Sequence, residues 1–243
     1  MLTSSGLGII STTDLYDSNT VKDHVLGQPV QTVDGRKFRY AKCGATATVT
    51  GDCYSSAAQD AQFQTMATAA ATAIGGNIVY TTNGTTTVAA NDFDEGYLMI
   101  SSSTGIGQSS FILSHTTGAS GAAVNYTIAD PMKVALVAAA STVTVIKNPF
   151  DDVVIQAATP VASTAGIAQF AIVAAEFGWI QTGGPAACLW DTTVGAVDNL
   201  GVAPSTTTAG TVTVAYAASA IIGMSMQVVP VNARVCPVFL QID

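Results

Sequence analysis

The chain has 243 residues, of which 10% are charged and 49% are apolar, and its formal net charge is −8. Its length fits one large β domain or two small ones, and a charge content well below the usual value of about 25% leaves wide neutral surfaces, which favour assembly with other subunits. The net negative charge argues against nucleic-acid binding, and the sequence has no membrane-spanning apolar run and no signal peptide, so we expect a soluble, unexported protein.

The first 28 residues are rich in Ser, Thr, Gly and Asp and show little hydrophobic periodicity. They are predicted to form an extended N-terminal arm with weak order of its own. The segments PVQTV and KFRYAK then flank Asp34-Gly35, which predicts a β-hairpin. The basic residues in or beside this hairpin form either a solvated strand face or a cationic patch that docks on an acidic neighbour. They are Lys22, Arg36, Lys37, Arg39 and Lys42.

Residues 55–73 are alanine-rich and begin with serine, which makes them the one good helix candidate. The threonines in this segment leave a short helix at 55–66 followed by a loop as an alternative. From residue 76 onward, short β-branched and aromatic runs alternate with Gly, Pro, Asn and Asp at intervals of roughly eight to twelve residues. The pattern predicts a mostly β protein, an antiparallel, jelly-roll-like β-sandwich or barrel with the N-terminal arm and at most one short helix. Residues 29–243 would form its β-rich body, with a candidate sub-boundary near residue 150, at Asn148-Pro149.

The sequence offers little for catalysis. Nucleophilic catalysis needs a Ser or Cys beside a His base, and the two histidines, His24 and His115, have no G-x-S-x-G motif near them. The P-loop pattern is absent, and GIGQSS at 105–110 lacks the third glycine of the dinucleotide fingerprint. We therefore predict no enzymatic activity and no cofactor.

Two acidic clusters and four cysteines are the remaining candidates for a metal site. Paired carboxylates bind Ca²⁺ or perform acid–base work, but both clusters lie where a turn before a strand is expected, which favours local hydrogen bonding. The cysteines lack a C-x-x-C pair, so they are predicted to be reduced, partly buried thiols rather than zinc ligands, with a Cys43–Cys53 disulfide as the alternative. The clusters are Asp92, Asp94 and Glu95, and Asp151 and Asp152; the other cysteines are Cys188 and Cys236.

The segment GWIQTGGPAACLW, residues 178–190, places Trp179 and Trp190 on either side of Gly183-Gly184-Pro185. The glycines permit backbone angles or close approaches that a side chain forbids, and the proline presets a turn. We interpret this segment as a packed structural hairpin corner, with a platform for a ligand or partner as the alternative.

Several phrases match a known family in their order along the chain. They are LGQPVQTVDGRKFRYAKCGA, ANDFDEGYLMISSSTGIGQSSFILSH, ADPMKVALVAAASTVTVIKNPFDDVV and AAEFGWIQTGGPAACLW. Over residues 26–243 the chain resembles virion structural proteins of tailed bacteriophages, among them capsid decoration (cement) proteins. The phrases DGRKFRYAK, GWIQTGGPA and DPMKVAL are the most specific, and the first 25 residues match less clearly.

The resemblance implies a non-enzymatic, β-rich structural protein that binds the outside of an icosahedral head, often as a trimer at local threefold axes. It would be made in the host cytoplasm, reside on the capsid surface, contact the major capsid protein and clamp adjacent capsomers. We expect residues 1–28 and the hairpin around Arg36, Lys37, Arg39 and Lys42 to make the capsid and intersubunit contacts.

Three other classes of protein remain as alternatives. A head-fibre or tail-associated adhesin would bind a host-surface glycan through Trp179, Trp190 or Tyr97. A glycan hydrolase would need one acidic cluster to converge with another in space. A free-standing binding module would be a monomer in solution.

Overall fold

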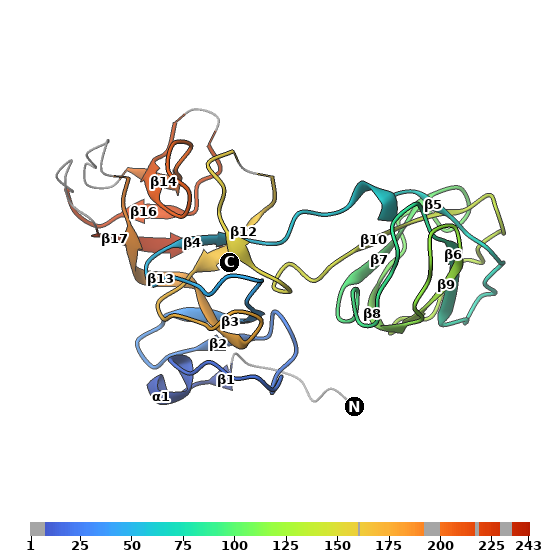
Figure 1. Ribbon diagram of the computed structural model, residues 1–243, viewed down its shortest axis with the longest axis horizontal. Coiled ribbons are helices and arrows are strands. Elements are labelled where there is room, and N and C mark those ends of the chain that lie inside the picture. The colour runs from blue at the N-terminus through green and yellow to red at the C-terminus, as the bar shows by residue number, and fades with distance from the viewer. Residues whose placement is uncertain (1–7, 160, 192–199, 217–218, 229–234) are drawn as a thin grey trace. The chain divides into compact units, whose positions relative to one another are not determined.

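The computed structural model describes residues 8–159, 161–191, 200–216, 219–228 and 235–243. Within it the chain forms two compact units. Unit 1 is built from the two ends of the chain, up to Ala57 and from Pro149 onward, and unit 2 is the continuous segment Ala58–Asn148, coloured teal to yellow-green in Figure 1. Each unit has a hydrophobic core of its own.

Unit 2 is inserted between two paired strands of unit 1. The strand before the insertion, β4, pairs antiparallel with the strand after it, β11, through Ser55 with Val154 and Tyr54 with Ile155. The chain therefore leaves unit 1 and returns to it at adjacent positions. The return junction lies at Asn148-Pro149, where the sequence suggested a boundary. The exit junction lies inside the segment that was predicted to be a helix.

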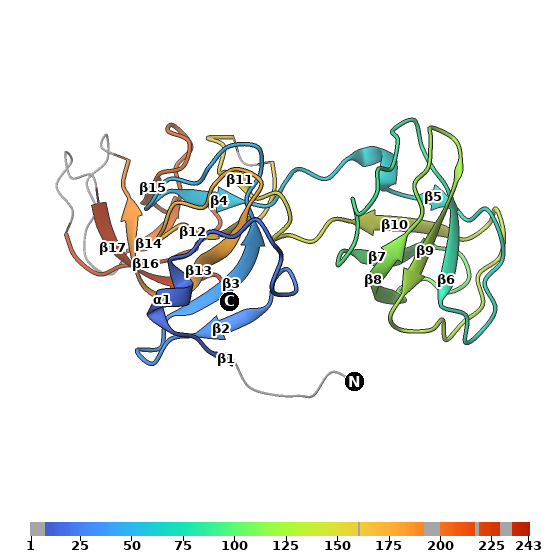
Figure 2. The same cartoon turned by 60° about the horizontal axis from the view of Figure 1, so that its bottom comes forward.

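The described strands of unit 1 belong to one sheet in which all strand pairs except the first are antiparallel. The main path runs β1-β2-β3-β13-β17-β16-β14-β15, and β12, paired with β13, joins β4 and β11 to it. Figure 2 shows β13 passing beside β3. The elements are β1 (Gly8–Ile9), the helix α1 (Thr12–Leu15), β2 (Pro29–Gln31), β3 (Lys37–Lys42), β4 (Cys53–Ser55), β11 (Val154–Ile155), β12 (Thr164–Ile167), β13 (Phe177–Leu189), β14 (Gly201–Pro204), β15 (Val212–Val214), β16 (Gly223–Ser225) and β17 (Val235–Gln241).

Unit 2 is an antiparallel sheet in the order β5-β10-β7-β8-β9-β6. A bridge between Thr68 and Thr81 links the chain after β5 to β6, so the sheet nearly closes into a barrel. Strand residues alternate between the interior and the surface, as in β9, where Val124, Tyr126 and Ile128 are buried. Its elements are the 3₁₀ helix η1 (Ala61–Phe63), β5 (Met66–Ala67), β6 (Ile78–Thr82), β7 (Tyr97–Ser102), β8 (Ser109–His115), β9 (Ala123–Ile128) and β10 (Thr142–Ile146). The predicted mostly β, sandwich or barrel class is thus confirmed.

The helix predicted at 55–73, or at 55–66, is wrong. This segment contains the end of β4, the exit junction, η1 and β5. Phe63 and Met66 point into the core of unit 2, and the Thr68 hydroxyl donates to the carbonyl oxygen of Val137 at 2.8 Å. Core packing and these distant hydrogen bonds override the helix propensity of alanine.

The described part of the N-terminal segment, residues 8–28, is mostly irregular and packs on unit 1. β1 pairs with β2, and Asn19 exchanges backbone hydrogen bonds of 2.9 and 2.8 Å with Phe177 of β13. Leu15 is 1% exposed and packs with Leu26 in a cluster that includes residues of β2, β3 and β13. Residues 8–28 are therefore part of the folded surface of unit 1, and residues 1–7 lie outside the described part of the chain.

The hairpin corner predicted around Gly183-Gly184-Pro185 is also wrong. Residues Phe177–Leu189 form one strand, β13, whose register against β3 shifts between Gln181 and Gly183, as at a β-bulge. Gly184 has φ +80°, and the Gln181 side-chain amide donates to the carbonyl oxygens of Gly183 and Pro185, both at 2.9 Å. The Gly-Gly-Pro sequence thus bends a continuous strand instead of ending it.

We predict that unit 2 folds without unit 1. A fragment of residues 58–148 should give a dispersed nuclear magnetic resonance spectrum and a cooperative thermal transition, because its core is complete within the segment. Replacing the same residues by a short Gly-Ser linker should leave unit 1 folded, because the linker would join two strands that already pair. A fragment with the spectrum of an unfolded chain would contradict the prediction.

Candidate functional site

The predicted contact residue Arg36 is engaged within unit 1. Its guanidinium Nε lies 2.9 Å from the Asp34 carboxylate, and its Nη1 lies 3.4 Å from the Tyr16 hydroxyl, a bond that raises the pKa of Arg36. The Thr32 hydroxyl donates to the Asp34 carboxylate and lowers the pKa of that group, and Arg36 adds to the effect. The carboxylate of Asp34, in the hairpin turn, thus holds the Arg36 guanidinium in place.

Lys37, Arg39 and Lys42 also have partners in unit 1. The Lys37 Nζ lies 3.2 Å from the main-chain oxygen of Asp243, and the Arg39 Nη2 lies 2.5 Å from the Asp243 carboxylate. The Lys42 Nζ lies 2.8 Å from Asp152 and 3.5 Å from Asp151. The positive charge of the hairpin is therefore compensated locally, which weakens the electrostatic case for a docking patch; its role in intersubunit contact stays a prediction.

Unit 1 presents an apolar sheet face over β13, β17 and β16, whose outward side chains are partly exposed. Along β17 the side chains alternate, so that Cys236, Val238 and Leu240 enter the core while Val235, Pro237 and Phe239 face outward. The strand register places the outward residues in rows, since Phe239 pairs with Pro185 on one side and with Met224 on the other. We call this surface the apolar face. It consists of Pro185, Ala187, Leu189, Met224, Val235, Pro237 and Phe239.

The large side chains of the apolar face are partly exposed among the described residues. Phe239 is 43% exposed and Met224 is 40% exposed. Isolated exposed apolar residues are ordinary, but a row that crosses three adjacent strands is typical of a surface that contacts another protein. The alternation of buried and exposed side chains in β17 can be read from the sequence. Which side of the sheet stays exposed cannot.

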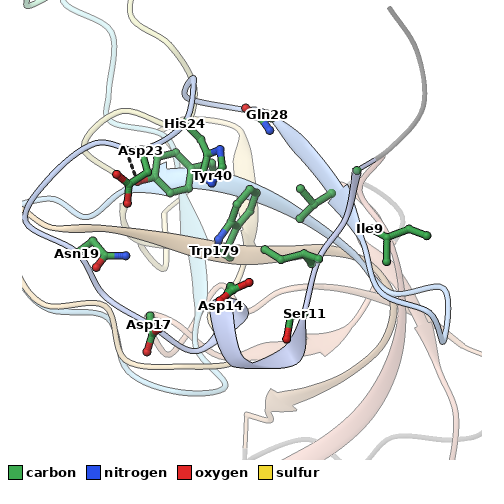
Figure 3. A pocket seen from close by; sticks show the side chains of 13 residues that line it. Ile9, Ser11, Asp14, Asp17, Asn19, Asp23, His24, Gln28, Tyr40 and Trp179 are labelled. Carbon is green, nitrogen blue, oxygen red and sulfur yellow. Dashed lines mark hydrogen bonds between the residues drawn. The ribbon is translucent and has the colours of Figure 1, made fainter.

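The second feature of unit 1 is a pocket of about 410 Å³ between the N-terminal segment and strands β2, β3 and β13 (Figure 3). Tyr40 and Trp179 form its aromatic wall, with ring centroids 5.0 Å apart. His24 packs on both rings, at 5.1 Å from Tyr40 and 5.2 Å from Trp179. Burial raises the pKa of Tyr40, whose hydroxyl oxygen accepts a 3.1 Å hydrogen bond from the Asp23 backbone N–H. The predicted arm, the predicted hairpin and Trp179 thus all contribute residues to this pocket.

The other aromatic residues proposed for ligand binding do not join this pocket. Trp190 is buried in a separate cluster with Cys188 and Cys236. Tyr97 belongs to unit 2, on β7. Sequence reasoning identified Trp179 but missed the polar residues of the N-terminal segment that face it, because their spacing follows an irregular chain and no periodic element.

His115 has a structural role. Its Nε2 accepts a 3.1 Å hydrogen bond from the Phe93 backbone N–H, and its Nδ1 lies 3.1 Å from the carbonyl oxygen of Thr116. Both ring nitrogens are thereby used, and the ring carries its hydrogen on Nδ1. Asp94 lies 3.6 Å from the same ring, and Asp92 accepts a 2.7 Å hydrogen bond from the Ala89 N–H, which fits the predicted turn chemistry.

The cysteines and carboxylates form no metal site among the described residues. All four cysteines are free and buried, so the alternative Cys43–Cys53 disulfide is not formed. Burial raises the pKa of the Cys53 thiol to about 12 and that of Cys236 to about 11, which keeps both thiols protonated and poorly nucleophilic. The acidic clusters lie in different units, Asp92 in unit 2 and Asp151 in unit 1.

Comparison with known proteins identifies no relative: neither a family model, nor a curated protein, nor a solved structure matches this chain. The resemblance to phage virion proteins therefore stays a prediction. Among the described residues, no helix has the length and apolar character needed to cross a membrane.

Asp52 should make unit 1 less stable as the pH rises. Burial raises the pKa of this carboxyl from 3.8 to about 6, so the folded chain holds the proton to a higher pH than the unfolded chain does. The free energy of unfolding should then fall between about pH 4 and about pH 6, by on the order of 1–2 kcal/mol. Asp52→Asn should remove this slope and stabilise the protein at pH 7, as measured by urea unfolding across the pH range. A variant that keeps the slope would contradict the assignment.

Proposed function

We propose that this chain is a structural virion protein that binds the outer surface of a bacteriophage capsid and stabilises the contacts between capsomers, as a homo-oligomer, with a trimer as the expected state. The observation that carries the proposal is the apolar face of unit 1. The low charge content of the chain and the sequence resemblance to decoration proteins support it further.

The apolar face gives such a protein a physical means of attachment. Burying a large apolar side chain contributes about 1.5–3 kcal/mol, so a surface that contains Phe239, Met224 and Val235 supplies a useful share of an interface. A protein that repeats over a symmetric shell needs only modest affinity at each contact, because many copies act together.

Attachment by the apolar face also agrees with the ion pairs that already neutralise the basic side chains of the hairpin. Arg36, Arg39 and Lys42 already pair with carboxylates of unit 1. Recruiting them to a capsid would exchange existing ion pairs for new ones, with little net gain. In this proposal the hairpin and the N-terminal segment lie at the edge of the interface, and the apolar face supplies most of its affinity.

Substitution on the apolar face should separate attachment from folding. The double variant Met224→Ser and Phe239→Ser should lose most of its binding to capsids in co-sedimentation, while its unfolding free energy changes by about 0.5 kcal/mol per site or less, because both side chains are already exposed. Tyr97→Ser in unit 2 is the matched control, since Tyr97 is 40% exposed and lies outside the face. Unchanged sedimentation of the double variant would argue against attachment by this face.

The copy number in purified virions tests the function itself. A decoration protein should be present in amounts close to those of the major capsid protein, as measured by quantitative mass spectrometry. A few copies per particle would favour the head-fibre or tail-associated adhesin, and complete absence from virions would reject a structural virion role.

A further inference from the structure

The pocket beside Tyr40 and Trp179 contains an indole N–H that has no hydrogen-bond partner among the described residues. Trp179 is 4% exposed and lines the pocket, and its indole N–H makes no hydrogen bond among the described residues. Figure 3 shows it in the middle of the pocket, with Tyr40 and His24 on one side and Asp14 on the other. An N–H donor that lines a cavity and has no partner among the described residues can donate to an acceptor on a ligand bound there.

The same pocket is lined by exposed acidic side chains that have no partner of their own among the described residues. The side chains of Asp14, Asp17 and Asp23 line the pocket and take part in no ion pair or side-chain hydrogen bond there. Asn19 and Gln28 add two carboxamides, each of which both donates and accepts. The pocket thus presents one aromatic wall, one fixed N–H donor, carboxylate acceptors and two groups of mixed character.

We propose that this pocket binds a neutral polyhydroxylated ligand, the terminal residue of a carbohydrate. A sugar hydroxyl donates to a carboxylate and accepts from an N–H at the same time, so it satisfies both kinds of group in this pocket. The volume of about 410 Å³ falls within the range of small-molecule sites, about 300–1,000 Å³. Carbohydrate binding by this pocket is independent of capsid attachment by the apolar face.

Two other ligand classes fit the pocket less well. A guanidinium or ammonium group would pair with the carboxylates, but it has no acceptor for the Trp179 N–H. A metal ion is disfavoured because the described carboxylates of the pocket do not converge into a cluster that could hold one. The hydroxyl ligand is therefore the class that leaves the fewest groups of the pocket unpaired.

The two tryptophans of the chain make the test direct. A proton–nitrogen correlation spectrum of the full chain should contain two indole N–H signals, which the variant Trp179→Phe assigns. We would titrate glucose, galactose, mannose, N-acetylglucosamine, lactose and cellobiose. At least one sugar should shift the Trp179 signal with saturation, at a dissociation constant on the order of 1 mM or below. The Trp190 signal, which comes from a separate core, should stay in place.

Variants decide whether the pocket is responsible. Asp14→Asn with Asp23→Asn should weaken the binding by about tenfold or more, because hydrogen bonds to charged acceptors are lost. Asp130→Asn, the same chemical change in unit 2, should leave it unchanged. An unshifted Trp190 signal in each variant shows that the core of unit 1 is intact.

Three results would overturn the proposal. In the first, no sugar of the panel shifts the Trp179 signal. In the second, N-acetyl-lysine amide or N-acetyl-arginine amide shifts it and the sugars do not, which would assign a cationic side chain as the ligand. In the third, sugar binding persists unchanged in the variant Asp14→Asn with Asp23→Asn, which would place the binding elsewhere. None of these results depends on whether the protein attaches to a capsid.

Discussion

Unit 1 depends on one strand that changes partners along its length. The first half of β13 pairs with β3 and its second half with β17, and the bulge lies between the two halves. Gly184 is favoured at the change of partner because it has φ +80°, and a Cβ there would also lie 3.1 Å from the Cα of Arg36. A side chain at Gly184 would therefore strain the backbone and crowd the hairpin.

The same strand connects the two surfaces discussed above. Trp179, near its start, belongs to the aromatic wall of the pocket, while Pro185 and Ala187, near its end, belong to the apolar face. The aromatic wall of the pocket and the apolar face are therefore both held by the main-chain pairing of β13, although most polar residues of the pocket come from the N-terminal segment. A binding surface held in this way loses little conformational entropy when its partner binds.

The sequence was enough to predict features that depend on residues close together in the chain. It was not enough where contacts between distant residues determine the local structure. Alternation in segments such as Ala123–Ile128 was enough to predict the β class, and the Asp34-Gly35 signal predicted the hairpin. The helix prediction failed because Phe63 and Met66 pack against residues far along the chain. Gly183-Gly184-Pro185 resembles a turn locally, and only the partners on both sides of the strand show that it is a bulge. The pocket could not be predicted, since an irregular segment supplies most of its polar residues.

The inserted position of unit 2 affects the order in which the protein folds during synthesis. Unit 2 is a continuous segment, so all of it emerges from the ribosome before most of its host does. The hairpin of β2 and β3, by contrast, must wait for β13, and β13 must wait for β17, which comes after it in the sequence. During this delay Phe38, Tyr40 and an open sheet edge are exposed to other nascent chains. Within unit 2, the Lys147 N–H donates to the Gln59 side chain at 3.0 Å, so the two ends of this unit lie close together. An insert that folds first would therefore keep β4 and β11 near each other and would shorten the search for their pairing.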